Sequence, residues 1–330
     1  MGKPGILARA GLIGLGWLAS GANAADDPRA WLDRMRNAVE FLNYEGTMVH
    51  VNDADTSVLR IVHRARNGEV TERITSSDLG REIIRTNEEV ICILTDQGKV
   101  LVEPRDERSR QQSPLRANLP AARSVNSALY QVAFAGVENV AGRRTQVIAI
   151  RPKDSFRYGY RVAIDRANSM PLKTQLLDEE GRLLEQILFT EIAFQKDIAD
   201  AELKPSIRLD SLATFRAPSA RRLEETGAVS DGWNAQDLPP GFRMTVARAR
   251  PAPNLPDGVR HVVYSDGLAT VSLFIEPAVA ASEQAEGLSR IGAANAYSTT
   301  VDSVMITAIG EVPARTVELF ARGTRLAGGR

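Results

Sequence analysis

The stretch VLRIVHRARNGEVTERIT, residues 58–75, decides the fold because it holds two strand-like segments around a turn. Apolar and polar residues alternate on both sides of Asn67 and Gly68, which is the period of a β-strand. Asn-Gly is the strongest two-residue hairpin signal, since both turn positions need a positive φ. The stretch therefore predicts an antiparallel hairpin with strands at 58–65 and 69–75.

Similar segments continue on both sides of this hairpin. We predict further strands at 44–51, 82–85, 90–95, 99–103, 145–151, 158–165, 172–178 and 183–194. Strands at short spacing without alternating helices favour an antiparallel meander, and a sheet this wide must curl or close. Helical spacing occurs ahead of the series at 28–42, where one apolar stripe is formed by Trp31, Met35, Val39 and Leu42.

Two stretches interrupt this rhythm and divide the chain. The polar, arginine-rich stretch 104–123 is predicted as a long loop that leads into a short helix at 124–134. The stretch 205–231 carries proline, glycine and charges, which is typical of an interdomain linker. We therefore predict a large domain at 25–204 and a small domain at 232–330.

The small domain is predicted to contain four further strands besides the stretch YSDGLATVSLFIEP, residues 264–277. These strands are expected at 242–249, 260–265, 295–300 and 303–309, with a final helix at 311–321. If Asp266-Gly267 is a two-residue turn, Tyr264 faces Ala269 across the ladder. One face is then apolar enough to be core, and it carries Val262, Tyr264, Ala269, Val271, Leu273 and Ile275.

The opposite face of this hairpin is half polar and carries one aromatic residue, Phe274. It is either an ordinary solvated surface or a docking face. Phe274 and Tyr264 are the partner-binding candidates, although Tyr264 fits the core equally well.

The first residues predict export. Lys3 and Arg9 form a positively charged region before a short apolar run at 10–19. After the run, Ala22-Asn23-Ala24 matches an A-x-A cleavage site. The run is too short to span a bilayer, so we expect a signal peptide at 1–24 and a soluble periplasmic mature chain. Cys92 is the single cysteine, so no internal disulfide is expected, and its apolar neighbours predict an inert thiol.

Composition and motifs argue against several classes of function. Lys plus Arg and Asp plus Glu both total 41, and aromatic residues make up 5%, so nothing favours a nucleic-acid partner. His50, His63 and His261 lie outside any metal-binding motif, and no nucleophile elbow or phosphate-binding loop occurs. We expect no metal, no cofactor and no catalytic residue, and interpret His50 and His63 as surface or rim residues. A hydrolase with an unrecognised site stays an alternative.

The loop at 104–123 holds the main local cluster of basic residues. It is either a solvated loop or a contact for anionic lipid phosphates, which the arginine fork suits well. The candidates for lipid-phosphate contact are Arg108, Arg110 and Arg116.

The order of these features resembles the MucB/RseB family of periplasmic negative regulators of the sigma-E (AlgU-type) envelope-stress response. The resemblance spans nearly the whole mature chain. It is carried by NYEGTMVH (43–50), PLKTQLLDEEGRLLE (171–185), YSDGLATVSLFIEP (264–277), GAANAY (292–297) and GEVP (310–313). These motifs are structural and identify no active site.

The resemblance implies an α+β, β-rich fold. Its large domain is a curved antiparallel half-barrel sheet with helices, as in lipoprotein carriers, and a small sheet-and-helix domain follows. It also implies binding to the periplasmic domain of a RseA/MucA-like anti-sigma factor, protection of that factor from proteolysis, and release by lipopolysaccharide or lipid A fragments. Members form dimers or larger homo-oligomers. A periplasmic carrier or chaperone for lipids or lipoproteins is the alternative.

Overall fold

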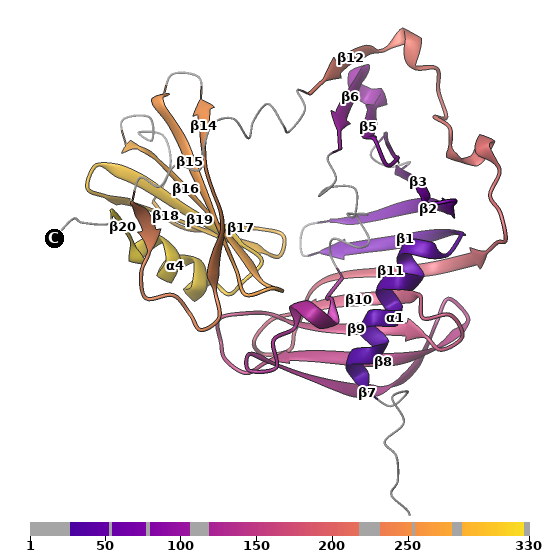
Figure 1. The fold of residues 1–330 in the computed structure, drawn as a ribbon, viewed down its shortest axis with the longest axis horizontal. Coiled ribbons are helices and arrows are strands. Elements are labelled where there is room, and N and C mark those ends of the chain that lie inside the picture. The colour runs from indigo at the N-terminus through magenta and orange to yellow at the C-terminus, as the bar shows by residue number, and fades with distance from the viewer. Residues whose placement is uncertain are drawn as a thin grey trace, which may run out of the picture.

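The computed structural model describes residues 27–52, 55–76, 80–105, 119–217, 232–252, 255–278 and 286–326. Within these ranges the chain forms a twelve-stranded sheet, a six-stranded sheet and a two-stranded ribbon. Figure 1 shows the two larger sheets side by side, with a helix against each. The predicted fold class, an open, β-rich sheet followed by a small sheet-and-helix domain, is confirmed. No helix in these ranges is long and apolar enough to cross a membrane.

The large sheet has the strand order β12-β6-β5-β4-β3-β2-β1-β11-β10-β9-β8-β7. Neighbours along the chain pair antiparallel, and β1 joins β11 to unite the two halves. The bounds are β1 Tyr44–Asn52, β2 Thr56–Arg66, β3 Glu69–Ser76, β4 Arg81–Arg85, β5 Glu89–Leu94, β6 Lys99–Pro104, β7 Tyr130–Val140, β8 Arg143–Pro152, β9 Gly159–Asp165, β10 Pro171–Leu177, β11 Leu183–Phe194 and β12 Ala213–Arg216.

The hairpin predicted at Asn67-Gly68 is confirmed. Arg66 lies opposite Glu69, so the turn has two residues, and φ is 55° at Asn67 and 81° at Gly68. Asparagine and glycine tolerate this left-handed conformation better than other residues, which explains why the turn forms here.

Helix α1 (Pro28–Phe41) lies across one face of the large sheet (Figure 1). Its N-cap is Asp27, whose carboxylate accepts a hydrogen bond from the Arg29 N–H, and Pro28 fills the first turn. Leu32 and Met35 are fully buried against a cluster that includes Ile148, Ile150, Val162 and Ile164. Burial of this apolar stripe holds the helix on the sheet.

The small sheet has the order β14-β15-β16-β19-β18-β17 and carries helix α4 (Ala314–Gly323). Its bounds are β14 Arg243–Ala252, β15 Leu255–Ser265, β16 Thr270–Pro277, β17 Gly287–Ile291, β18 Ala294–Val301 and β19 Val304–Gly310, and the separate ribbon pairs β13 (Trp233–Ala235) with β20 (Thr324–Leu326). Phe320 on α4 packs its ring edge-on against Phe242 and tilted against Tyr264, which joins the helix to the sheet core.

The predicted register of the β15–β16 hairpin is wrong by two residues, but its predicted core face is confirmed. Tyr264 lies opposite Val271, so the connection spans 266–269 instead of two residues. The Asp266 carboxylate widens the loop because its Oδ1 accepts hydrogen bonds from the N–H groups of Leu268 and Ala269. A slip of two residues keeps every side chain on its face.

Two local predictions differ from the structure. The helix predicted at 124–134 is wrong: a 3₁₀ turn at Ala122–Ser124 is followed by β7, whose backbone pairs with β8. Pairing with a neighbouring strand overrides a weak local helical pattern. The predicted linker contains β12, which pairs parallel with β6, and its residues 218–231 lie outside the described ranges.

Candidate binding pocket between the two sheets

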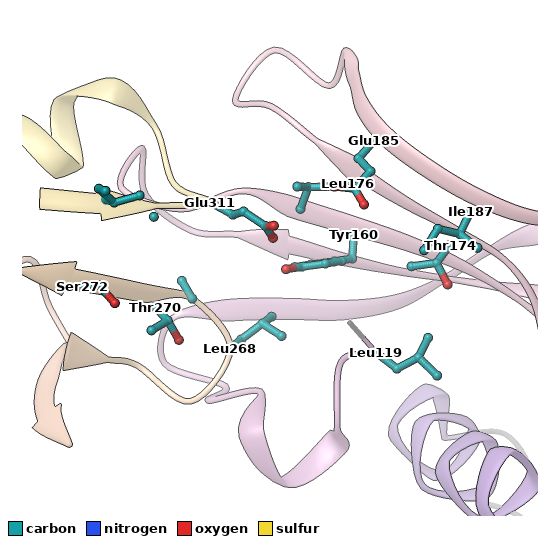
Figure 2. A pocket seen from close by; sticks show the side chains of 13 residues that line it. Leu119, Tyr160, Thr174, Leu176, Glu185, Ile187, Leu268, Thr270, Ser272 and Glu311 are labelled. Carbon is teal, nitrogen blue, oxygen red and sulfur yellow. The ribbon is translucent and has the colours of Figure 1, made fainter. Parts of the chain in front are cut away.

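A pocket of about 320 Å³ lies where the small domain meets the large sheet. Figure 2 shows side chains from both domains pointing into it. The large domain contributes Leu119, Tyr160, Thr174, Leu176, Glu185 and Ile187, and the small domain contributes Leu268, Ala269, Thr270, Ser272, Ile309, Gly310 and Glu311. Its size falls at the lower end of about 300–1,000 Å³, the range of small-molecule sites.

The floor of the pocket consists of two neighbouring rows of residues on the large sheet. Glu185 lies opposite Leu176 and Leu176 opposite Tyr160, while Thr174 lies opposite Ile187 in the adjacent row. Directly opposed residues point to the same face. Tyr160 lies two residues from Val162, which packs in the α1 cluster, so pocket and helix share one face.

His50 on β1 forms an ion pair with Glu185 beside the pocket. Its Nε2 lies 2.8 Å from Glu185 Oε1, and His50 lies opposite Ile187 in the second row. The hydrogen bond to Glu185 raises the pKa of His50, although partial burial opposes this. His50 is 28% exposed beside the pocket, in agreement with its interpretation as a rim or surface histidine, but its pairing with Glu185 was not predicted. Within the described residues no serine, threonine or cysteine hydrogen-bonds this imidazole.

Glu311 enters the same pocket from the small domain, directly after β19. Figure 2 shows its carboxylate and the Tyr160 hydroxyl pointing toward one another. Glu311 is exposed, but the protein around the pocket partly removes its carboxylate from bulk water. This desolvation raises the pKa of Glu311, and the nearby negative charge of Glu185 raises it further. Burial raises the pKa of Tyr160 well above its usual range, so the phenol stays protonated.

The structure places Tyr264 and Phe274 on opposite faces of the small sheet. Tyr264 is 2% exposed, and its hydroxyl accepts a hydrogen bond from the Ala235 N–H. Its ring is part of the core of the small domain, so almost none of its surface is available to a partner. Phe274 is half-buried and stacks on His261, with 4.6 Å between ring centroids. The His261 ring also contacts the Ser272 hydroxyl, so the face of Phe274 continues into the pocket wall.

The boundary beside the pocket is fixed by one buried charged group from each domain. Arg157, which precedes β9, is fully buried, and its Nε lies 3.3 Å from Asp266 Oδ2. The Tyr130 hydroxyl donates to the same Oδ2 at 2.8 Å. Arg157 Nη2 also donates to the Pro240 carbonyl at 2.7 Å, and its guanidinium lies over the Phe242 ring.

Neutral hydrogen bonds also join the two domains. Asn295 Nδ2 donates to the Tyr158 hydroxyl at 2.9 Å, and the Thr316 hydroxyl donates to the Phe156 carbonyl at 2.9 Å. Apart from Tyr130 on β7, the large-domain groups in these contacts belong to residues 156–158, in the segment between β8 and β9. The pocket therefore lies beside a set of fixed contacts.

Sequence reasoning missed Arg157 and Glu311, because single charged residues in turns give no periodic signal. It also placed His63 at the surface. His63 is 1% exposed, its Nδ1 lies 2.9 Å from the Leu42 carbonyl oxygen, and burial lowers its pKa. Arg108, Arg110 and Arg116 lie outside the described residues, as does the predicted signal peptide. Cys92 is half-buried in β5, and burial raises the pKa of its thiol.

No group of three His, Cys, Asp or Glu side chains in the described ranges could hold a metal ion. The pocket has acidic, hydroxyl and apolar groups. Its chemistry is that of a binding site that combines apolar contact with a few polar groups.

Comparisons with known proteins match most of the chain. Family models described as the MucB/RseB N-terminal domain and the MucB/RseB C-terminal domain match residues 27–207 and 228–325. The sigma factor AlgU regulatory protein MucB of Pseudomonas aeruginosa is 31% identical over 313 residues, covering 93% of this chain and 94% of that protein. The sigma-E factor regulatory protein RseB of Haemophilus influenzae is 29% identical over 288 residues, 87% of each chain.

A solved structure shows the same two-part architecture. The crystal structure of MucB in complex with MucA(peri) matches with a TM-score of 0.70 and 28% sequence identity, covering 92% of this chain and 100% of that one. The similarity thus extends over both sheets and the boundary between them.

Proposed function

The chain belongs to the MucB/RseB family, and from this premise we propose that it is a periplasmic regulator that binds the periplasmic domain of a membrane anti-sigma factor. The observation that carries the proposal is the similarity over 92% of the chain to a MucB structure solved in complex with MucA(peri). In this proposal, residues 1–24 are a cleaved signal peptide, 25–204 and 232–330 are two domains, and 205–231 link them.

The geometry supports binding instead of catalysis. A pocket bounded by two domains can close on an extended segment, with contributions from both walls. Bound anti-sigma factor would be shielded from the site-1 protease, which keeps the sigma factor sequestered and restrains the envelope-stress response.

Release follows if lipopolysaccharide or lipid A fragments prefer a different arrangement of the two domains. Each ligand then lowers the affinity for the other by the same factor, because the coupling free energy is shared. Arg108, Arg110 and Arg116 stay the proposed contacts for lipid phosphates. We also propose that the protein is a homo-oligomer, as the family resemblance implies.

A binding measurement tests this function. The mature chain is titrated with the periplasmic domain of the anti-sigma factor of the same organism, with and without lipid A fragments. We expect saturable binding, slower cleavage of the anti-sigma factor by the site-1 protease, and lower affinity with lipid A. Absence of binding would refute the proposed function, whereas binding that lipid A leaves unchanged would refute only the release step.

A further inference from the structure

The pocket carries two carboxylates, one from each domain, and their charges are compensated unequally. Glu185 Oε1 faces His50 Nε2 at 2.8 Å. No hydrogen bond or ion pair to the Glu311 carboxylate is formed by any residue that the structure describes. His50 attracts the Glu311 carboxylate electrostatically but does not bond to it. A carboxylate in a partly desolvated site without a directly bonded cation is costly, and a positive charge placed there would relieve the cost.

The remaining lining supplies neutral polar groups and apolar surface. Tyr160, Thr174, Thr270 and Ser272 offer hydroxyl groups, and no lysine or arginine occurs among the lining residues that the structure describes. An anionic headgroup would therefore meet two carboxylates, of which only Glu185 is hydrogen-bonded to a histidine. The pocket favours the opposite charge.

The apolar part of the lining indicates what carries this positive charge. Leucine and isoleucine side chains from both domains surround the carboxylates: Leu119, Leu176, Ile187, Leu268 and Ile309. A small inorganic cation would leave this surface unused. A charge at the end of a hydrocarbon stem would cover it, as lysine and arginine side chains do when their stems lie along apolar surface.

We propose that this pocket binds a lysine or arginine side chain of an extended polypeptide segment, with its cation between Glu185 and Glu311 and its stem and neighbouring apolar residue against the leucine and isoleucine walls. This inference rests on the proposed function and names the chemistry of the partner segment that enters the site. Arginine suits the site best, because its planar fork can donate to two carboxylates and a phenol oxygen at once.

Two short peptides test the charge requirement directly. Acetyl-Leu-Arg-Leu-amide and its citrulline counterpart have nearly the same shape, but only the first carries a positive charge. Calorimetric titration of the mature chain at pH 7.5 should show the arginine peptide binding about tenfold more tightly or better, as expected for a hydrogen-bonded charge pair. Equal affinities would overturn the proposal.

Substitutions locate the effect. Glu311→Gln and Glu185→Gln keep the side-chain shape and should each remove most of the preference for arginine over citrulline. Glu318→Gln on α4 is the control, because the Glu318 side chain is 46% exposed, pairs with Arg322 and does not line this pocket. Thermal melts confirm that each variant is folded. Retention of the preference in both pocket variants would refute the site.

The same variants separate this inference from the function on which it rests. If the anti-sigma domain binds the wild-type chain and Glu311→Gln and Glu185→Gln equally well, the pocket inference fails and the proposed function stands. If the anti-sigma domain does not bind the wild-type chain, the proposed function fails, while the peptide comparison still decides the chemistry of the pocket.

Discussion

Arg157 and Asp266 face each other across the domain boundary with both side chains fully buried, and Arg157 Nε lies 3.3 Å from Asp266 Oδ2. Asp266 also shapes the β15–β16 loop through its other oxygen, and it accepts a hydrogen bond from Tyr130. One carboxylate thus determines a local turn and the attachment of the small domain. The position of the pocket depends on this contact, because Leu268–Thr270 line it immediately after Asp266.

Arg157→Met should destabilise the protein by about 3–5 kcal/mol, because it leaves a buried carboxylate without its cation. Arg182→Met is the control: Arg182 pairs with Asp178 but is 74% exposed, so solvent screens the pair and its loss should leave the urea midpoint nearly unchanged. Urea denaturation compares the two variants. Combining Arg157→Met with Asp266→Asn should recover part of the loss, and an unchanged urea midpoint for Arg157→Met alone would contradict the assignment.

Gly267→Ala should loosen the domain boundary. Gly267 has φ of +103°, and an added Cβ would lie 2.7 Å from the Ser124 carbonyl oxygen of the large domain. Gly181→Ala is the matched control, since Gly181 has φ of +80° but no atom within 4 Å of the added Cβ. The control should cost about 1–2 kcal/mol for backbone strain alone.

The difference between these glycine variants measures the clash at the boundary. We expect Gly267→Ala to cost about 1–3 kcal/mol more than the control, a typical cost of overpacking. Urea midpoints give the total loss of stability for each variant. Faster limited proteolysis between the domains would show that the domains separate more readily. If both variants lose the same stability, the Ser124 carbonyl group moves away from the added Cβ at no measurable cost.

The sequence predicts features of this fold that depend on neighbours along the chain. The Asn67-Gly68 hairpin needs only two residues that tolerate positive φ. The core face of β16 survives a register error of two because side chains alternate along a strand. Such local rules hold without knowledge of the rest of the molecule.

The pocket could not be predicted in the same way, because it depends on contacts between distant segments. His50 meets Glu185 only because β1 pairs with β11, 135 residues further along the chain. Glu311 joins them only through the docking of the small domain at Arg157 and Asp266. No periodic pattern marks such isolated charged residues, whereas the family resemblance gives the architecture without identifying them.

Phe274→Ala should weaken capture of the anti-sigma domain about tenfold, as expected for an aromatic residue at an interface. The fold should lose little stability, about 0.5–1.5 kcal/mol for the ring stack with His261. Leu288→Ala is the control, because Leu288 is 57% exposed on β17 and lies opposite Tyr297, a residue of the core face. Affinity measurements on both variants decide the role of Phe274. Equal affinity of Phe274→Ala and wild type would make this face an ordinary surface.

His50 and His63 should titrate on opposite sides of the ordinary histidine pKa of about 6.5. The hydrogen bond to Glu185 raises the pKa of His50, whereas burial lowers that of His63. The folded chain therefore binds more protons at His50 than the unfolded chain, and fewer at His63. The stabilisation from His50 is fully present below about pH 6.5 and is lost as pH rises through the pKa of His50 in the folded chain. The stabilisation from His63 is fully present above about pH 6.5 and is lost as pH falls through the pKa of His63 in the folded chain.

Histidine ring-proton NMR between pH 5 and 8 checks this, with Glu185→Gln as the decisive variant. Without the Glu185 carboxylate, partial burial lowers the pKa of His50 and only the more distant Asp55 and Glu311 raise it, so this pKa should fall. The His63 curve should not move, because its ring lies near Tyr44 and Leu42, away from Glu185. Urea unfolding of Glu185→Gln should then lose the part of the stability that declines above pH 6.5. Two histidines titrating together, or a His50 curve unaffected by Glu185→Gln, would show that the ion pair does not persist in solution.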